Sequence, residues 1–405
     1  MIFKIKTIIY KGLVNTVKFV GHLIPINPPI IFAGKDSSIQ LSDAIVQMGH
    51  KSLLLVTDKM LVEIGLINNV LSNLENNSMK VVVYSGVLPD PTNSQVDEGV
   101  SLALSNHCDA VLAIGGGSSI DAAKAISACI TNNKNAKQLS GLLKVKQRPL
   151  PLYVIPTTAG TGSEATLAAL ISDDTTHKKK LLIDPSLIPK MAALDGQLML
   201  TLPPAITAAS GMDALTHAIE AFISTNSTDE TNALALSASK LILNNLETAV
   251  FAGDNFAARQ SMAIASYYAG AAFTKAGVGY VHAIAHAIGA KYGTAHGIAN
   301  AMILPHVLTY SYSHIEPLLA QIAKNAGLVT HEASINDAAL RLIDKIKELN
   351  IAFDMPCHFD DLKPEHIKSI AKEALKEAHY TPYAVPMYMD QKTCEMLISN
   401  MQPST

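Results

Sequence analysis

Short apolar runs separated by helix-like stretches fill the first half of the chain. They cover residues 51–57, 80–84, 110–114 and 152–155. Continuous runs rich in valine, isoleucine and leucine, with helical segments between them, are typical of a parallel sheet covered by helices on both faces. We therefore predict an α/β domain with a parallel sheet over residues 1–200.

The pattern changes near Leu202-Pro203-Pro204. Beyond this point the sequence is rich in alanine, has the period of a helix and contains few strand candidates; A-L-A-L-S-A-S-K-L-I-L-N-N-L is one example. Apolar positions at helical spacing predict helices that bury one face. We expect an all-helical domain over residues 201–405.

Composition agrees with a large folded chain. The 405 residues are 49% hydrophobic and 16% charged, with a formal net charge of −3. A chain of this length usually forms more than one hydrophobic core, so two domains are expected. The low charge gives no attraction to nucleic acid, and the apolar excess indicates a large interior and buried contacts in a homo-oligomer.

The chain shows no sign of a membrane span or a disulfide framework. No apolar run approaches the ~20 residues that a spanning helix needs. The N-terminal segment mixes lysines into apolar sequence, which favours an amphipathic extension packed on the protein over a signal peptide or membrane anchor. The four cysteines have no C-x-x-C spacing, so we expect isolated thiols and a cytoplasmic protein.

Histidines at helical spacing provide the strongest chemical signal. His282, His286 and His296 lie in one segment, and Asp213 and His217 lie about seventy residues upstream. Residues four apart project from one face of a helix, so each i, i+4 pair can direct two ligand atoms at one point. Imidazole and carboxylate ligands suit zinc or ferrous iron. Spacing alone leaves open which of the five bind a metal, and structural histidines are the alternative.

Two polar loops follow predicted strands. Residues 115–119 (G-G-G-S-S) stand between a strand and a helix, where glycine backbone and the helix N-terminus can bind a diphosphate. Residues 156–164 (P-T-T-A-G-T-G-S-E) place hydroxyls beside two glycines. A structural glycine turn and a helix cap at Ser163 are the respective alternatives. Asp58, which ends the first apolar run, could bind a ribose 2′-OH, which favours NAD over NADP, or could cap a helix.

Taken in order along the chain, these residues resemble the iron-containing (group III) alcohol dehydrogenase family. The resemblance runs from V-T-D-K-M-L-V-E-I-G-L (56–66) through G-G-G-S-S-I-D-A-A-K (115–124) and the threonine loop. It continues through G-M-D-A-L-T-H (211–217) to H-G-I-A-N-A-M-I-L-P-H (296–306). It implies a dinucleotide-binding domain, a helical metal-binding domain and an active site in the cleft between them.

The resemblance also assigns roles to residues. It implies one divalent metal, Fe(II) or Zn(II), held by Asp213, His217, His282 and His296, with His286 beside the metal as a candidate catalytic proton relay. It implies substrate contact at Phe273. Cofactor contacts carry over to Asp58, Gly116, Gly117, Ser118, Asp121, Thr157, Thr158, Thr161 and Lys179. Lys178 or Lys180 could replace Lys179.

The chain departs from the family pattern in a few places. Lys275 stands where the family often has asparagine, and could either bring positive charge to the substrate pocket or point to solvent. Two prolines common near the histidines are absent, and the first thirty residues fit the family weakly.

The resulting prediction is a metal-dependent, NAD-dependent alcohol dehydrogenase that interconverts a small alcohol and its aldehyde or ketone by hydride transfer. NADP remains possible as the cofactor. The rival enzyme is an NAD- and metal-dependent sugar-phosphate cyclase or lyase of the dehydroquinate-synthase-like type, which would need basic residues for a substrate phosphate. A non-catalytic binding protein would require a lost ligand, which the sequence does not show.

Overall fold

A computed structural model describes residues 7–14, 16, 26–175, 178–381 and 383–403. Its contacts form two compact units. The sheet unit comprises residues 25–202 and 253–270, and the helical unit comprises the rest. The break at 202 lies beside the boundary expected at 200, but two segments group differently from that expectation: residues 253–270 belong to the sheet unit, and the described residues before 25 belong to the helical unit.

Specific contacts account for both segments. The Gln260 amide donates to the Leu194 carbonyl at 2.9 Å and accepts from the Gly196 amide at 2.9 Å, which ties the 253–270 segment to the sheet unit. At the N-terminal end, the Tyr10 ring stacks on the His379 ring with centroids 4.4 Å apart. The local sequence pattern predicts neither of these contacts.

The main sheet has six parallel strands in the order β1-β9-β6-β4-β2-β3. Their bounds are β1 (Ile30–Ala33), β2 (Ser52–Val56), β3 (Lys80–Tyr84), β4 (Ala110–Gly115), β6 (Leu152–Pro156) and β9 (Met191–Leu194). Four of them are the apolar runs that predicted strands, so the prediction of an α/β domain with a parallel sheet is confirmed.

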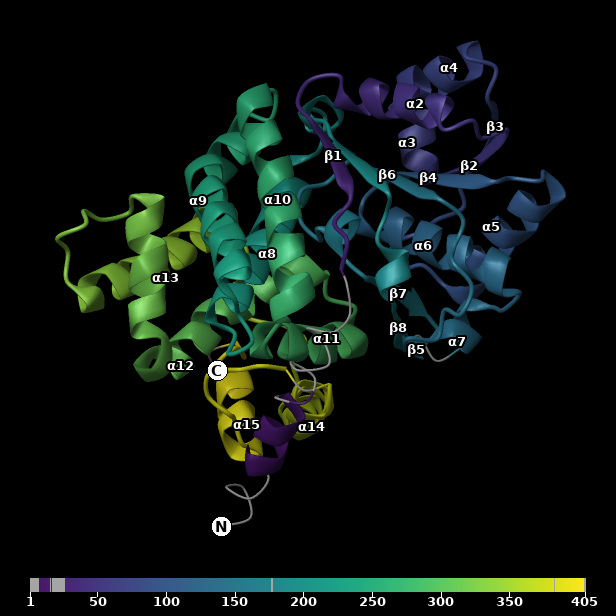
Figure 1. The fold of residues 1–405 in the computed structure, drawn as a ribbon. Coiled ribbons are helices and arrows are strands. Elements are labelled where there is room, and N and C mark those ends of the chain that lie inside the picture. The colour runs from purple at the N-terminus through teal and green to yellow at the C-terminus, as the bar shows by residue number, and fades with distance from the viewer. Residues whose placement is uncertain (1–6, 15, 17–25, 176–177, 382, 404–405) are drawn as a thin grey trace. The chain divides into compact units, whose positions relative to one another are not determined.

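Helices cover both faces of this sheet (Figure 1). Alternate side chains of β2 enter two separate cores, because neighbours along a strand point to opposite faces. Leu54 and Val56 pack with α5, α6 and α7, whereas Leu53 and Leu55 pack with α2 and α4. The helices are α2 (Ser37–Gln47), α3 (Lys59–Glu63), α4 (Asn68–Asn76), α5 (Asn93–Ser105), α6 (Gly117–Asn132) and α7 (Ala136–Leu139).

A second, three-stranded sheet in the order β5-β8-β7 also belongs to the sheet unit, and the sequence analysis did not predict it. Its strands are β5 (Gly141–Leu142), β7 (Ala168–Ser172) and β8 (Lys179–Ile183), and short 3-10 turns cover Ser163–Ala165, Pro185–Leu187 and Gly196–Met199. Lysines begin β8, and most of its side chains are partly or fully exposed. Half-exposed short strands of this kind lack the continuous apolar run that marks a central strand.

The helical unit confirms the second fold prediction, since residues 203–381 and 383–403 contain no strand. Its helices are α8 (Pro204–Ile223), α9 (Asp229–Phe251), the end of α10 (Phe256–Ala276), α11 (Tyr280–Tyr292), α12 (His296–Ala326), α13 (Ile335–Ala352), α14 (Pro364–Tyr380) and α15 (Gln391–Ser399). Helix α8 packs on both α9 and α12. From Gly211 to Ile223 it is buried on all sides, so polar residues there lie in the interior.

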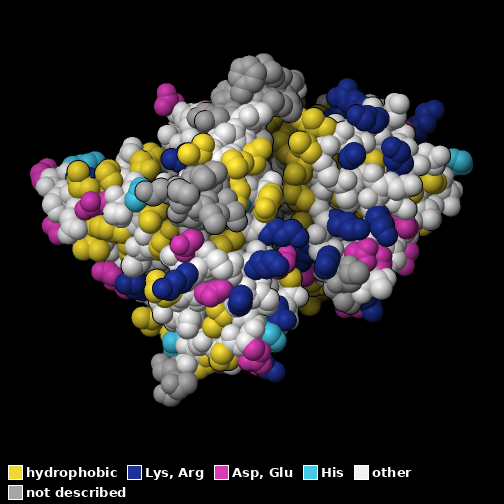
Figure 2. Space-filling view, turned by 90° about the horizontal axis from the view of Figure 1, so that it is seen from below, with side chains coloured by type: hydrophobic (Ala, Val, Ile, Leu, Met, Phe, Trp, Pro, Cys, Tyr) yellow, Lys and Arg dark blue, Asp and Glu magenta, His cyan; other side chains and the backbone are white. Residues whose placement is uncertain are grey.

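One face of the molecule carries charged side chains of both signs (Figure 2). On the face drawn in Figure 2, apolar side chains form patches among basic and acidic side chains. Within the described residues, no helix combines the length and apolar character needed to cross a bilayer.

Candidate functional site

Four of the five predicted metal-ligand candidates converge in the helical unit. One ligand atom each from Asp213, His217, His282 and His296 lies within 4.8 Å of the other three. Ligands ~2.1 Å from a common ion lie within about 4 Å of one another, so this donor set fits a divalent first-row metal. The fifth candidate, His286, lies outside the set.

Three of the four candidate ligands are buried, and the fourth is partly exposed. Asp213, His217 and His282 are at most 5% exposed, whereas the His296 side chain is 33% exposed. The His296 Nε2 atom lies 3.4 Å from Asp213 Oδ1, and His282 Nε2 lies 3.9 Å from the same oxygen. Solvent can therefore approach the ligand atoms beside His296.

Local sequence explains how three helices bring these side chains together. Asp213 and His217 are one turn apart on α8, whereas His282 lies in the first turn of α11 and His296 begins α12. Gly297 permits the close approach of α12 to α8, because a Cβ there would lie 2.3 Å from the Ala209 carbonyl oxygen. The glycine directly after His296 is thus a packing requirement.

His282 has polar partners on both sides of its ring. Its Nδ1 atom lies 2.6 Å from Glu220 Oε2, and the Asn300 amide nitrogen lies 3.2 Å from its Nε2 atom. Burial, together with His217 and His296 nearby, lowers the pKa of His282 well below its ordinary value. Burial raises the pKa of Glu220 to about 7, although backbone N–H groups at the start of α11 oppose the shift. A neutral imidazole is the form that binds metals.

His286 belongs to a separate hydrogen-bonded group beside the ligands. Its ring stacks on that of His296 at a centroid distance of 5.1 Å, and its Nδ1 atom lies 2.7 Å from Glu377 Oε1. The Tyr383 hydroxyl donates to the same oxygen at 2.6 Å. Burial raises the pKa of Glu377, but the hydrogen bonds from His286 and Tyr383 outweigh it, so this pKa lies below its ordinary value. The Glu377 carboxylate in this position holds the His286 ring in place through Nδ1.

The two predicted substrate residues occupy different surroundings. The Phe273 ring stacks on the imidazole of His217 at 4.3 Å, which places an apolar surface directly beside a ligand. The Lys275 ammonium group instead donates to both carboxylate oxygens of Glu230, at 2.7 and 2.8 Å. A substrate anion would have to compete with Glu230 for this lysine.

In the sheet unit, the glycine and threonine loops are neighbours. They follow β4 and β6, which are adjacent parallel strands, so both loops lie at one edge of the sheet. A Cβ on Gly116 would lie 3.3 Å from Thr158 Oγ1, and one on Gly117 would lie 2.7 Å from Thr161. Helix α6 begins at Gly117, with Ser118 in its first turn, and Thr157 follows β6 directly. Backbone N–H groups, a helix N-terminus and threonine hydroxyls thus meet where open α/β sheets bind nucleotides.

A buried lysine holds the threonine loop against α6. The Lys124 ammonium nitrogen lies 2.7 to 3.1 Å from five oxygen atoms of Ser163, Thr166 and Ala168. Burial lowers its pKa to about 8. The Asp121 carboxylate accepts from Ser163 Oγ at 2.6 Å and from the Leu170 amide at 2.9 Å. Both oxygens of this predicted cofactor contact are therefore already bonded within the protein.

Two further predicted cofactor residues also have partners. Asp58 caps α3, with Oδ1 accepting from the Leu61 amide at 3.0 Å, as its alternative interpretation predicts. The hydrogen bond uses one carboxylate oxygen. Lys179 begins β8, and its ammonium group lies 2.5 Å from Asp90 Oδ1.

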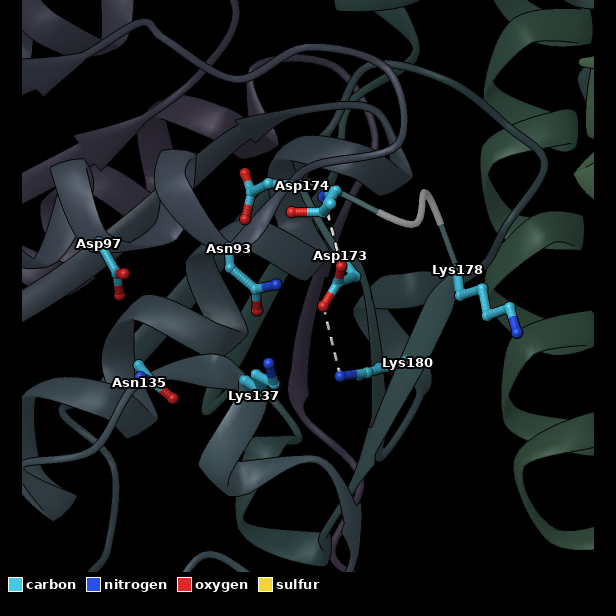
Figure 3. Close-up of a pocket in the computed structure, with 9 residues that line it drawn as sticks. Asn93, Asp97, Asn135, Lys137, Asp173, Asp174, Lys178 and Lys180 are labelled. Atoms are coloured by element: carbon cyan, nitrogen blue, oxygen red, sulfur yellow. Dashed lines mark hydrogen bonds and ion pairs between the residues drawn. The ribbon is translucent and has the colours of Figure 1, made fainter.

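A hollow of about 580 Å³ opens elsewhere on the sheet unit, and Figure 3 shows the residues that line it. Lys180 points at Asp173 across this hollow, with their charged atoms 3.5 Å apart. Lys178 and Lys180, the two alternatives to Lys179, line it, but the other predicted site residues do not. Its basic and acidic groups are mixed, so it offers no uniform charge to a ligand.

Comparison with known proteins connects both sites to one family. The profile of "Iron-containing alcohol dehydrogenase" matches residues 28–196, and that of "Fe-containing alcohol dehydrogenase family, C-terminal" matches residues 207–401. An NAD-dependent methanol dehydrogenase from Bacillus methanolicus is 37% identical over 86% of this chain and 92% of that protein. The chain belongs to the iron-containing alcohol dehydrogenase family.

Other family members agree in sequence and in fold. Lactaldehyde reductase from Escherichia coli K12 is 36% identical over 85% of this chain and 91% of that protein. A crystal structure of 1,3-propanediol oxidoreductase superposes with a TM-score of 0.88 at 33% identity, covering 93% of this chain and all of that one.

As a family member, the chain is an NAD-dependent alcohol dehydrogenase that uses a divalent metal. This finding confirms the dehydrogenase prediction over the sugar-phosphate cyclase. It also agrees with the convergence of the four candidate Asp and His ligands.

The sequence analysis did not identify three polar residues near the candidate ligands, although the spacing of two of them could have indicated their position. Glu220 follows His217 by three residues, and Asn300 follows His296 by four, so both share a helix face with a ligand. Glu377 lies 91 residues from His286, the residue that it contacts. No spacing rule connects those two positions.

Proposed function

We propose that Asp213, His217, His282 and His296 bind the catalytic metal of this alcohol dehydrogenase. The observation that carries the proposal is the convergence of their ligand atoms within 4.8 Å. When bound, the metal and NAD supply Lewis-acid polarisation of the alcohol or carbonyl oxygen and a hydride acceptor or donor. These four side chains would hold the metal, and the exposed side of His296 is where a substrate would enter.

We assign the nicotinamide cofactor to the edge of the sheet formed by the loops after β4 and β6. Backbone N–H groups at Gly116, Gly117 and Ser118 would donate to the diphosphate, helped by the partial positive charge at the start of α6. Thr157, Thr158 and Thr161 would supply hydroxyl contacts. Asp121 acts through Ser163, to which it is bonded, and so maintains the shape of the threonine loop.

We assign Asp58 to the ribose of NAD and Lys179 to a cofactor oxygen. The carboxylate oxygen of Asp58 outside the helix cap remains able to accept a ribose hydroxyl. A carboxylate there would repel the 2′-phosphate of NADP, so NAD is the preferred cofactor. Lys179 would have to exchange Asp90 for the cofactor.

We propose His286 as the group that carries the alcohol proton away from the site. Its ring stacks on His296 and is 30% exposed, so it lies between the open side of the ligand group and solvent. Glu377 holds its Nδ1 atom, which leaves Nε2 to receive a proton. The transfer of a proton to a positioned histidine is ordinary general-base catalysis.

For the substrate, we propose a small alcohol or diol that packs on Phe273. The named activities of similar proteins concern methanol, lactaldehyde and 1,3-propanediol, all of them small. A role for Lys275 in binding an anionic substrate requires the release of Glu230. We therefore expect neutral substrates to be preferred.

The remaining proposals concern the metal and the setting of the enzyme. Fe(II) and Zn(II) both suit this donor set, so the metal bound in the cell depends on which one is available. We expect a cytoplasmic protein. We also expect a homo-oligomer, because apolar side chains are exposed on the edge strand β1, where Ile30 is 61% exposed. Light scattering after gel filtration measures the assembly, and a monomer would contradict the expectation.

One experiment tests the function directly. Protein loaded in turn with Fe(II) and Zn(II) is mixed with NAD and a series of primary alcohols and diols, and the formation of NADH is followed by absorbance. Metal content is measured in the same samples. Turnover with small neutral alcohols is expected, and the absence of turnover with every alcohol and aldehyde would refute the proposal.

A further inference from the structure

We propose that Glu220 is a positioning residue, which holds His282 with its proton on Nδ1 and its Nε2 lone pair directed at the other ligand atoms. The inference rests on the proposed metal site and adds to it a residue that never touches the metal. It concerns the choice between the two neutral tautomers of one imidazole.

The first observation is the position of the Glu220 carboxylate. Its Oε2 atom lies 2.6 Å from His282 Nδ1 and accepts from the Gly279 amide at 2.8 Å, and its Oε1 atom accepts from the Val281 amide at 2.8 Å. Glu220 is 3% exposed, so water does not replace these donors. Because both oxygens accept backbone N–H groups, the geometry assigns Glu220 the acceptor role toward His282 Nδ1, which then carries the hydrogen.

The second observation comes from the opposite side of the ring. The amide nitrogen of Asn300 donates to Asp213 Oδ1 at 2.7 Å, and this bond determines which end of the amide is the nitrogen. The same nitrogen lies 3.2 Å from both His282 Nε2 and His296 Nε2, so its second hydrogen can be donated to only one of them at a time. An amide nitrogen only donates, so a bond from Asn300 to His282 has the Nε2 lone pair as its acceptor. This contact is compatible with the tautomer that the position of Glu220 favours.

The position of Glu220 on α8 explains how it can orient His282. It follows His217 by three residues on α8, so the helix that carries two ligands also carries the group that orients a third. Its carboxylate bonds backbone amides at the start of α11, directly before His282. Gly279 makes the approach possible, because a Cβ there would lie 2.7 Å from Glu220 Oε1.

The proposal predicts what an isosteric amide would do. In Glu220→Gln, an NH₂ group must replace one of the two accepting oxygens. At the Oε2 position it would face the Gly279 amide and His282 Nδ1, and His282 would then carry its hydrogen on Nε2, where it must be lost before a metal binds. At the Oε1 position it would face the Val281 amide and disturb the start of α11, which carries His282. Outer partners of metal ligands typically change metal affinity 10–100-fold.

The test measures metal affinity without reference to turnover. Zn(II) or Co(II) is titrated against a competing chelator in the parent protein and in the Glu220→Gln variant, and the visible spectrum of the Co(II) form reports ligand geometry. Glu164→Gln is the matched control. Glu164 is 2% exposed and burial also raises its pKa to about 7, but it lies in the sheet unit.

We expect affinity to fall 10–100-fold in Glu220→Gln and to stay within about twofold of the parent in Glu164→Gln. The thermal midpoints of the chelator-treated proteins identify any loss that is due to unfolding. Parent-like affinity in a folded Glu220→Gln protein would overturn the proposal. If His282→Ala also retained full affinity, the proposed ligand set itself would be wrong.

A measurement on the parent protein covers the case in which Glu220→Gln does not fold. Nitrogen-15 NMR of histidine-labelled, chelator-treated protein distinguishes the two tautomers, and the signal absent from a His282→Gln spectrum identifies the residue. A hydrogen on Nδ1 is expected. A hydrogen on Nε2 of His282 would overturn the proposal.

Discussion

The sheet unit and the helical unit form their sites in opposite ways. In the sheet unit, the candidate cofactor site is made from backbone groups and hydroxyls of two loops that follow adjacent strands. In the helical unit, the candidate metal site is made from ionisable side chains of three helices, with further residues holding them. The first arrangement depends on how closely the two loops approach each other. The second depends on the position and protonation of single atoms.

The largest expected effect in this comparison is the loss of a metal ligand. His282→Ala removes a buried imidazole and leaves too few donors for tight binding, so metal and activity should disappear together, with activity reduced by at least about a thousandfold. Metal analysis and steady-state kinetics check this result. The affinity for NADH, followed by fluorescence, should stay within about twofold, and full metal occupancy would contradict the ligand assignment.

Replacing His286 separates proton transfer from metal binding within the same unit. His286→Ala should keep the metal, because His286 lies outside the ligand set. The value of kcat should fall by about 10²–10⁴, the usual contribution of a general base. Glu377→Gln should lower kcat by a smaller factor, because it removes a partner of the relay and leaves the relay in place. An unchanged rate and pH profile in His286→Ala would exclude the relay.

In the sheet unit, a single methyl group should disturb cofactor binding. Gly117→Ala would place a Cβ 2.7 Å from Thr161, which forces the two loops apart. We expect KM for NAD to rise about tenfold, equivalent to roughly 1.4 kcal/mol, with metal content unchanged. An unaltered KM would show that the loops do not bind the cofactor.

Cofactor preference should respond to Asp58. Asp58→Gly removes the carboxylate that would repel a 2′-phosphate, so the ratio of kcat/KM for NAD to that for NADP should fall about tenfold. Asp390→Gly is the matched control, because Asp390 caps α15 through the Thr393 amide at 2.8 Å just as Asp58 caps α3. Equal ratios in the two variants would leave Asp58 with a capping role only.

The smallest expected effect concerns stability and involves Glu164 in the sheet unit. Burial raises the pKa of Glu164 to about 7 in the folded protein, above its ordinary 4.5. Between these values the unfolded chain is ionised while the folded carboxyl is neutral, so Glu164 destabilises the fold increasingly as pH rises from about 4.5 to 7. Glu164→Gln should therefore raise the thermal midpoint more at about pH 8 than at about pH 5. A pH-independent difference would contradict this result.

Much of the fold could be predicted from local patterns. The runs that became β2, β3, β4 and β6 are apolar throughout because both sheet faces are covered. The strand β8 could not be predicted in this way, because its side chains are partly exposed and its first residues are lysines. The grouping of residues 253–270 with the sheet unit depends on contacts such as that of Gln260 with Leu194, which lie 66 residues apart.

The candidate metal site likewise combines residues that the sequence could predict with contacts that it could not. The i, i+4 spacing of Asp213 and His217 predicted a shared helix face, and family resemblance selected His282 and His296 from the other histidines. No pattern placed Glu377 on His286, and none showed that the Lys275 ammonium group is bonded to Glu230. Those pairings depend on how helices distant in sequence pack.

By itself, the sequence determined the chemistry that is available: imidazoles and a carboxylate at helical spacing, and glycine and threonine loops after apolar strands. These features follow from the period of a helix and of a strand, which are local properties. Only the tertiary structure decided which atoms meet. The packing of α8, α11 and α12 brings four ligand atoms within 4.8 Å and places Glu220 on the far side of His282, because side chains from separate helices acquire a common position only when their helices pack.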